Sequence, residues 1–400
     1  MSDLARLIHA SAHHLPMIDD KSVQCVVTSP PYFGLRKYDG VQDVEWSEVT
    51  YSPMAGLPPI TIAGCDSGCT HEWTSTISPA KSGGTKSKKV QTKGKDNFQI
   101  VPPIESGTCT KCGGWRGGLG NEPTIEAYIG HLILCAREWR RVLRDDGVCF
   151  VNLGDSYATS PAGNKVATGF QQKQSAGQAG ALAQWQEGRS APRPLPLPNK
   201  NLMMIPARFA LAMQADGWIL RSEIIWHKPN PMPESVTDRP TKAHEQIYLF
   251  SKQERYFYDA AAVAEPSLTN EGRPNGIVRD RVFGYDSKQA KLQGREYTGI
   301  KIAEDAPQEP TTRNLRSVWS VATQPYSAAH FACFPPALVE PMIKAGSRVG
   351  DTVLDPFSGS GTTGSVAIKL GRKYIGVDLA ETYLDDLSPQ RLTVQMELTP

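Results

Sequence analysis

The sequence contains no apolar stretch long enough to cross a bilayer, and its first residues lack the charged-then-apolar pattern of a secretory signal. It has no internal repeat, and its net charge is only +2. These absences exclude a membrane span and a repeat array, and we expect a cytoplasmic protein without a membrane partner. The weak net charge neither requires nor excludes a nucleic-acid partner, because phosphates are bound by a local basic face.

What is present is ordinary for a globular enzyme. The 400 residues are 40% hydrophobic and 21% charged, which is enough to bury the core of one large or two modest domains. The chain has 8 cysteines. In the cytoplasm these are thiols or metal ligands rather than a disulfide framework. Four of them fall in apolar runs and are predicted to be small core residues: Cys25, Cys135, Cys149 and Cys333.

Two segments at opposite ends of the chain are typical of a parallel sheet. Residues 23–28 form a short β-branched run that ends at prolines, which cannot continue a strand ladder. Residues 352–378 show the order strand, glycine-rich loop, helix, strand of a βαβ unit. Further elements are expected in alternation: a helix over 125–143, a strand over 148–153, a helix over 202–216 and a strand over 218–226. This alternation predicts an α/β sheet covered by helices on both faces.

The glycine-rich loop DPFSGSGTTG, residues 355–364, follows a predicted strand. Gly359 and Gly361 permit a ligand to lie against the main chain, and Asp355 can accept a hydrogen bond from an ammonium or hydroxyl group. Asp378, at the end of the next strand, is placed to hold ribose hydroxyls. The loop lacks Gly-Lys-Ser/Thr and departs from the dinucleotide spacing, so a nucleoside without phosphate fits better. The alternative is an ordinary tight loop.

The second motif, TSPPY, spans residues 28–32. Two prolines stiffen the backbone, so the Ser29 hydroxyl and the Pro30 carbonyl form a rigid pair of acceptors suited to an NH2 group. Hydrogen bonds from both amino hydrogens would free a nitrogen lone pair to attack a methyl sulfonium in line, while a base stacks on Tyr32. The alternative is a proline turn on an edge strand, which the joint occurrence with the glycine-rich loop disfavours.

These residues resemble a known family, the bacterial and phage site-specific DNA amino-methyltransferases, in the β order in which the catalytic motif precedes the cofactor motif. The matching stretches are TSPPY at 28–32, IIWHKPNPMP at 224–233, VWSV at 318–321, HFACFPP at 330–336, DPFSGSGTT at 355–363 and YIGVDL at 374–379. The resemblance covers nearly the whole chain except its insertions.

The resemblance implies a Rossmann-like methyltransferase sheet, the cofactor S-adenosylmethionine, double-stranded DNA as substrate and a flipped target base. It also implies a place in restriction-modification and, by family habit, a homodimer. The catalytic residues would be Ser29, Pro30, Pro31 and Tyr32. The cofactor-binding residues would be Thr28, His330, Phe331, Phe334, Pro335, Asp355, Pro356, Phe357, Ser358, Gly359, Gly361, Thr362 and Asp378. Many relatives carry an acid ahead of the catalytic strand for the adenine; residues 9–13 here have none, so Ser11 or a backbone group would replace it.

The resemblance also divides the chain. We expect the catalytic part of the methyltransferase domain at 1–39, a cysteine-bearing insertion at 40–118 and the methyltransferase core at 119–258, with a mobile loop at 156–200. A target-recognition region would follow at 259–315, and the cofactor-binding part at 316–400. Within the recognition region the candidates for phosphate or guanine contacts are Arg273, Arg279, Arg281 and Arg295, although surface arginines are often only solvated.

The insertion carries five candidate metal ligands for four positions in a zinc-ribbon-like arrangement: Cys65, Cys69, His71, Cys109 and Cys112. A structural zinc would organise a stretch too polar to build a core, and the alternative is a set of free thiols. Six lysines lie between the cysteine pairs and either track the DNA backbone or form a solvated loop: Lys81, Lys86, Lys88, Lys89, Lys93 and Lys95.

The target base is adenine N6 or cytosine N4. Ser29 is more frequent in cytosine-N4 enzymes, whereas the stretch 227–245 resembles enzymes regarded as adenine-specific, and the balance leans slightly to adenine. Alternatives of another class are a DNA-binding protein that has lost catalysis, and an RNA or protein methylase. The intact TSPPY and DPFSGSG motifs disfavour loss of catalysis.

Overall fold

A computed structural model of the protein describes residues 4–34, 43–77, 104–158, 197–266, 312–324 and 334–397. The chain divides into two compact units, one formed by Met1–Asp259 with Ser317–Pro400 and the other by Ala260–Arg316. In the part of the chain that the structure describes, no helix is both long and apolar enough to span a membrane.

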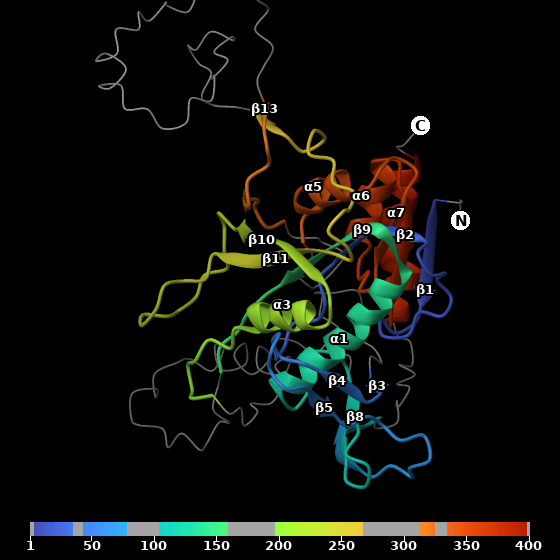
Figure 1. Ribbon diagram of the computed structural model, residues 1–400, viewed down its shortest axis with the longest axis vertical. Helices are drawn as coiled ribbons and strands as arrows, with labels where there is room; N and C mark the ends of the chain where they lie inside the picture. Colours follow the sequence, from blue (N-terminus) through green and yellow to red (C-terminus); the bar gives the residue numbers. More distant parts are fainter. Residues whose placement is uncertain are drawn as a thin grey trace, which may run out of the picture. The chain divides into compact units, whose positions relative to one another are not determined.

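The larger unit is built on an 8-stranded sheet with the order β1-β16-β15-β2-β9-β11-β10-β14. Figure 1 labels β1, β2, β9, β10 and β11 of this sheet. Its strands are β1 Ala5–His9, β2 Val23–Thr28, β9 Leu143–Leu153, β10 Ile219–His227, β11 His244–Ser251, β14 Val318–Ser320, β15 Thr352–Asp355 and β16 Lys373–Asp378. Five neighbouring strands of the sheet run parallel, namely β1, β16, β15, β2 and β9. β11 is antiparallel to both of its neighbours, and β14 is parallel to β10. The predicted strands at both ends of the chain are therefore adjacent in the sheet centre.

Helices cover both faces of this sheet, as the alternation predicted. They are α1 Ile125–Val142, α3 Ile205–Ala215, α5 Pro336–Gly346, α6 Thr362–Lys369 and α7 Ser388–Glu397, with a π-helix at Tyr383–Leu387. On β9, Cys149 and Val151 pack in one core with Trp139 of α1. The alternate residues, Val148 and Phe150, lie against Gly346 of α5 on the opposite face. Burial on both faces explains why β2 and residues 148–153 of β9 are buried throughout and mainly apolar.

Three cysteines of the sheet and helices confirm the core prediction. Cys25, Cys135 and Cys149 are buried and unpaired, and burial raises the pKa of each thiol above its usual range. These thiols are packing residues rather than nucleophiles, since a thiolate is disfavoured in an apolar interior. Cys333 lies outside the described residues.

The insertion between β2 and α1 forms small antiparallel sheets that the sequence did not predict. One has four strands in the order β3-β8-β7-β6, namely β3 Val44–Glu45, β6 Trp73–Ile77, β7 Ile104–Cys109 and β8 Trp115–Gly117. The other is a hairpin of β4 Val49–Tyr51 with β5 Ile60–Ile62. The hairpin docks on α1, where the Tyr51 hydroxyl donates to the carbonyl of Glu126 at 2.8 Å.

The smaller unit contains a two-stranded ladder, β12 Glu265–Pro266 with β13 Thr312–Arg313. The Glu265 carboxylate accepts hydrogen bonds from Arg313 and Arg316. The unit overlaps the predicted target-recognition region, whose role stays a prediction. Its four candidate arginines, the six lysines of the insertion and most of the predicted 156–200 loop lie outside the described residues.

Candidate functional site

The site lies at the carboxyl ends of neighbouring parallel strands, where the loops of an α/β sheet converge on ligands. β2 ends at Thr28 and leads into TSPPY, and β15 ends at Asp355 and leads into the glycine-rich loop. These two strands are paired, so the two motifs meet although they stand at opposite ends of the chain.

A buried hydrogen-bond network joins the two motifs. The Thr28 hydroxyl donates to one oxygen of the Asp355 carboxyl at 2.7 Å, and the Thr363 hydroxyl donates to the other at 2.7 Å. The backbone N–H of Phe357 also donates to this carboxyl at 3.1 Å. Burial raises the pKa of Asp355 to about 6, against the opposing effect of these donors. Asp355 thus fixes the start of both loops, and its direct contact with a ligand stays a prediction.

The glycine-rich loop turns at two residues with positive φ. Gly359 has φ 48° and Gly361, the N-cap of α6, has φ 75°, a region that glycine adopts without strain. The half-buried Asp378 accepts the N–H of Gly359 at 2.8 Å and that of Ala380 at 2.9 Å. Burial raises the pKa of Asp378 as well. The end of β16 therefore holds the loop from one side.

Two residues from the C-terminal helical segment hold the loop from the other side. The Ser388 hydroxyl donates to the Gly359 carbonyl at 2.7 Å. Arg391 donates to the Thr362 hydroxyl at 2.7 Å and to the Ser360 hydroxyl at 3.2 Å. Ser358 is buried against the Tyr374 hydroxyl at 2.8 Å. With both sides held, the loop is a preorganised rim for a ligand.

A pocket opens between the two motifs. Its lining combines both of them with the end of β16, the loop after β1 and the insertion. The lining residues from the two motifs and β16 are Ser29, Pro31, Pro356, Phe357 and Asp378, with Leu379 and Tyr383 beyond them. The rest come from the loop after β1, at Ala10, Ser11 and Ala12, and from the insertion and its exit, at Trp46 and Leu119. Ser11, the predicted substitute for the missing acid, therefore stands in the wall.

Tyr32 is held by its hydroxyl on the side of β11. The hydroxyl lies 2.8 Å from a carboxylate oxygen of Glu245 and 3.0 Å from the side-chain oxygen of Asn152, and it can donate to one of them at a time. The Ser29 hydroxyl donates to the same tyrosine oxygen at 3.2 Å. Glu245 is in turn paired with Lys228. The orientation of the Tyr32 ring is therefore set by a charged acceptor.

Close packing also fixes the proline loop. A Cβ atom on Gly154 would lie 2.5 Å from the Tyr32 ring, so only glycine leaves room for the ring at the end of β9. The Tyr128 hydroxyl donates to the Pro31 carbonyl at 2.8 Å. The Pro30 carbonyl, the predicted acceptor for an amino group, receives no hydrogen bond from the described part of the chain.

The comparisons with known proteins agree with this geometry. A family model for N6/N4 methyltransferases, described as DNA methylase, matches residues 23–388. The chain belongs to this DNA methylase family. The type II methyltransferase M.SmaI of Serratia marcescens is 38% identical over 267 residues, which are 67% of this chain and 75% of the relative. M.XycI of Xanthomonas campestris pv. cyanopsidis is 38% identical over 277 residues, 69% of this chain and 75% of the relative.

Solved structures are similar to this DNA methylase only loosely. The PvuII DNA methyltransferase, which is cytosine-N4-specific, has a TM-score of 0.46 at 15% identity, covering 99% of this chain and 92% of its own. A DNA modification methylase from Thermus thermophilus, complexed with S-adenosyl-L-methionine, has a TM-score of 0.45 at 18% identity, covering 98% of this chain and 96% of its own. At these TM-scores the likeness identifies neither a ligand nor a substrate.

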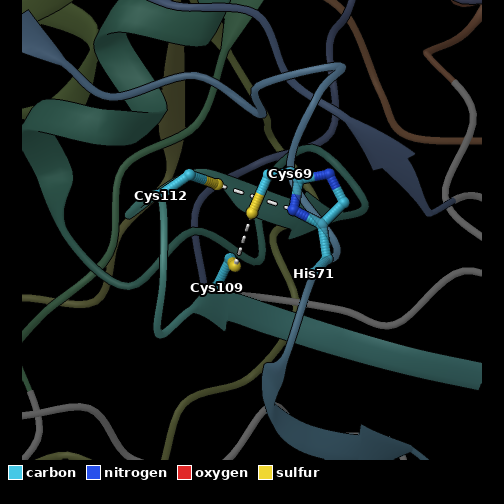
Figure 2. A group of neighbouring side chains, drawn as sticks. All are labelled: Cys69, His71, Cys109 and Cys112. Atoms are coloured by element: carbon cyan, nitrogen blue, oxygen red, sulfur yellow. Dashed lines mark hydrogen bonds between the residues drawn. The ribbon is translucent and has the colours of Figure 1, made fainter.

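Several predicted residues of the methylase do not line the pocket, among them Thr28, Pro30, Tyr32, Asp355, Ser358, Gly359, Gly361 and Thr362. Phe334 and Pro335 precede α5, which begins at Pro336 as expected, but they are absent from the pocket lining. His330 and Phe331 lie outside the described residues. Of the five metal candidates, the structure gathers Cys69, His71, Cys109 and Cys112 (Figure 2). Cys65 is not part of this group.

Several functional candidates of this methylase were missed from sequence. Glu245 and Asn152 sit on strands and reach Tyr32 only through tertiary structure. Ser388 and Arg391 sit in a polar helix with no distinctive motif. Trp46 belongs to the cysteine-bearing insertion, and nothing in the sequence indicates that this insertion reaches the pocket. For Glu245 the sequence offered one signal, because this acidic residue ends the family-like stretch 227–245.

Proposed function

We propose that this DNA methylase transfers a methyl group from S-adenosylmethionine to the exocyclic amino group of a base in DNA. The observation that carries the proposal is the shared pocket. Ser29 and Pro31 of the catalytic motif line it together with Phe357 of the cofactor motif and with Asp378 at the end of β16. A methyl donor in this pocket would lie directly beside the acceptor loop.

The donor supplies an electrophilic methyl group on a sulfonium sulfur. Residues of the pocket can bind its parts by chemistry that suits each. Asp378 would accept hydrogen bonds from ribose hydroxyls, since this residue lines the pocket at the end of β16. Ser11 would meet the adenine, and Phe357 and Pro356 provide apolar walls. The positive φ at Gly359 and Gly361 lets the main chain approach the ligand.

The acceptor side activates an amino nitrogen without a metal or a covalent enzyme intermediate. Ser29 Oγ and the Pro30 carbonyl oxygen accept the two amino hydrogens, which favours the pyramidal nitrogen and frees its lone pair. Tyr32 stacks on the base, and Glu245 and Asn152 hold the ring in orientation. The nitrogen–methyl bond forms as the methyl–sulfur bond breaks, and the amino group loses one proton to solvent. The same acceptor pair serves adenine N6 or cytosine N4, with adenine the slightly favoured base.

DNA is the proposed substrate, because the family is described as DNA methylase. The base has to leave the duplex, since the amino nitrogen of a paired base is stacked and hydrogen-bonded. The relatives are type II methyltransferases, which supports methylation within a defined sequence as part of restriction-modification. The unit Ala260–Arg316 is the candidate for reading that sequence. A silent DNA-binding role is disfavoured by the intact pocket.

Transfer of tritiated methyl groups tests this proposal. Purified protein is incubated with labelled S-adenosylmethionine and, separately, with duplex DNA, RNA and a protein mixture. The expected result is label in DNA alone, abolished in Tyr32→Ala and Ser29→Ala, which keep the wild-type unfolding midpoint. Label in RNA or protein, or undiminished label with Tyr32→Ala, would overturn the proposal.

A further inference from the structure

The insertion holds a second site, away from the catalytic loop. The ligand atoms of Cys69, His71, Cys109 and Cys112 all lie within 4.8 Å of one another (Figure 2). The sulfurs of Cys69 and Cys109 are 3.9 Å apart, and the Cys112 sulfur is 3.5 Å from Nδ1 of His71. A tetrahedral zinc with ordinary bond lengths places two sulfurs about 3.8 Å apart, and a sulfur and a nitrogen about 3.5 Å apart. These two distances therefore match those expected in a Cys3His zinc site.

The backbone around these residues has the form of two knuckles. In the first, the Cys69 N–H donates to the Asp66 carbonyl at 3.0 Å, and the Asp66 side chain accepts the N–H of Gly68 at 2.9 Å. In the second, Gly113 turns back with φ 76° and donates to the Cys109 carbonyl at 3.0 Å. The Lys111 N–H points at the Cys109 sulfur at 3.4 Å. Such N–H groups stabilise a thiolate, which is the form that ligates a metal.

Cys65 has a different position and a different partner. Its thiol donates to the Trp115 carbonyl at 3.4 Å, and its N–H donates to the Trp46 carbonyl at 2.8 Å. A Cβ atom on Gly114 would lie 2.6 Å from the Cys65 backbone, so the second knuckle packs directly against this residue. Cys65 therefore links the knuckles to Trp46 instead of completing the ligand set.

Trp46, which is hydrogen-bonded to Cys65, also lines the pocket. It is buried and stacks on His131 with ring centroids 4.2 Å apart. Trp115 of β8 also stacks on His131, with ring centroids 5.5 Å apart. His131 bonds to the buried Glu122, and Glu122 also accepts the N–H of Gly120 at 2.8 Å. Gly120 in turn accepts the N–H of Gly34, just beyond the TSPPY motif, at 2.9 Å.

We propose that Cys69, His71, Cys109 and Cys112 bind one structural zinc ion, and that this ion holds Trp46 in the wall of the pocket. The second half rests on the proposed function, which makes that pocket the methyl-donor site. A four-stranded sheet of short strands cannot bury enough apolar surface to stand alone, and a metal replaces the missing core. The zinc has no open position for a substrate, because four protein ligands fill its tetrahedral shell.

Metal analysis of the full-length protein, purified without chelator, tests the first half. We expect one zinc per chain in the wild type and in Cys65→Ser, and loss of zinc in Cys112→Ser. His71→Cys is the rescue variant and should keep zinc, since four thiolates also form a tetrahedral site. A wild type without zinc, a wild type holding iron instead, or equal loss in Cys65→Ser and Cys112→Ser would overturn the assignment.

Calorimetric titration with S-adenosylmethionine tests the second half. We expect Cys112→Ser and Trp46→Ala to raise the Kd about tenfold, equivalent to about 1.4 kcal/mol. Cys65→Ser keeps the backbone hydrogen bond to Trp46 and His71→Cys keeps a ligand, so both should stay near the wild type. An unchanged Kd in a zinc-free Cys112→Ser protein would overturn the coupling and leave the zinc site standing. No binding by the zinc-loaded wild type would overturn the proposed function and the coupling together, and again leave the metal result intact.

Discussion

At the scale of single residues, the Tyr32 hydroxyl shows how a motif depends on partners that its sequence does not contain. TSPPY predicts the acceptor pair and the stacking ring because prolines and aromatics have fixed local properties. It does not predict Glu245, because strands far apart in the chain meet only when the sheet forms. The proline loop can thus be predicted from the sequence, whereas the side chain that orients its tyrosine, Glu245, cannot.

This division predicts a specific pattern of kinetics. Glu245→Gln should lower kcat about tenfold, the loss expected from a hydrogen bond to a charged group, with little change in donor affinity. In a Tyr32→Phe background the same change should add almost nothing, because both substitutions act on the same hydrogen bond to a charged acceptor. Glu340→Gln, which breaks an exposed pair with Lys344, is the matched control. Additive losses in the double variant would refute this positioning role.

Gly154 gives a second prediction at this scale. An added methyl group would lie 2.5 Å from the Tyr32 ring, so Gly154→Ala must displace the ring or the strand end. We expect kcat to fall at least about tenfold while S-adenosylmethionine still binds, since the cofactor loop is on another strand. Kinetics and calorimetry measure the two effects separately. Wild-type kcat in Gly154→Ala would show that the ring position is not critical.

The buried carboxyl group of Asp355 makes the stability of the protein depend on pH. Its pKa is raised to about 6 by burial, so the native state holds the proton more tightly than the unfolded chain. Stability from this group is therefore present at low pH and falls as pH rises from about 4 to about 6, by up to about 1.4 kcal/mol per pH unit. Asp355→Asn removes the titration. Melting midpoints of the two proteins should shift in favour of Asp355→Asn as pH rises through this window; a constant difference would contradict the account.

At the scale of elements, the central strands of the sheet could be predicted from the sequence, whereas β11 and the helix α7 could not. β2, β15 and β16 are apolar runs that end in distinctive loops, so both position and length follow from the pattern. β11 begins with His244-Glu245-Gln246, whose polar side chains hide a strand that supplies a site residue. The helix α7 has little apolar periodicity, yet its Ser388 and Arg391 hold the glycine-rich loop.

Because α7 holds the glycine-rich loop, we expect a change in α7 to alter only the binding of the methyl donor S-adenosylmethionine. Ser388→Ala removes the hydroxyl that donates to the Gly359 carbonyl at 2.7 Å. A net hydrogen bond contributes about 1 kcal/mol, so we expect the Kd for S-adenosylmethionine to rise about fivefold with kcat at saturation nearly unchanged. Calorimetry and steady-state kinetics give the two numbers. A fall in kcat with unchanged Kd would mean that α7 acts on the acceptor side instead.

At the scale of the whole molecule, the resemblance to DNA amino-methyltransferases was confirmed by the family comparison, whereas the limits of each part stay predictions. The sequence predicts the cysteine-bearing insertion as a part of the chain separate from the methyltransferase core. The structure instead brings its Trp46 into the pocket wall, because β3 and β8 dock against α1 through aromatic stacking on His131. Stacking of this kind leaves no periodic trace in the sequence.

Nucleoside mass spectrometry of methylated DNA tests the central claim most directly. Duplex DNA is incubated with purified protein and S-adenosylmethionine, digested to nucleosides, and compared with DNA treated with Tyr32→Ala. Our account predicts N6-methyladenine or N4-methylcytosine in the wild-type reaction and neither in the variant. A methyl group on a ring carbon such as C5 of cytosine, or the same amino-methylated product from Tyr32→Ala, would contradict it.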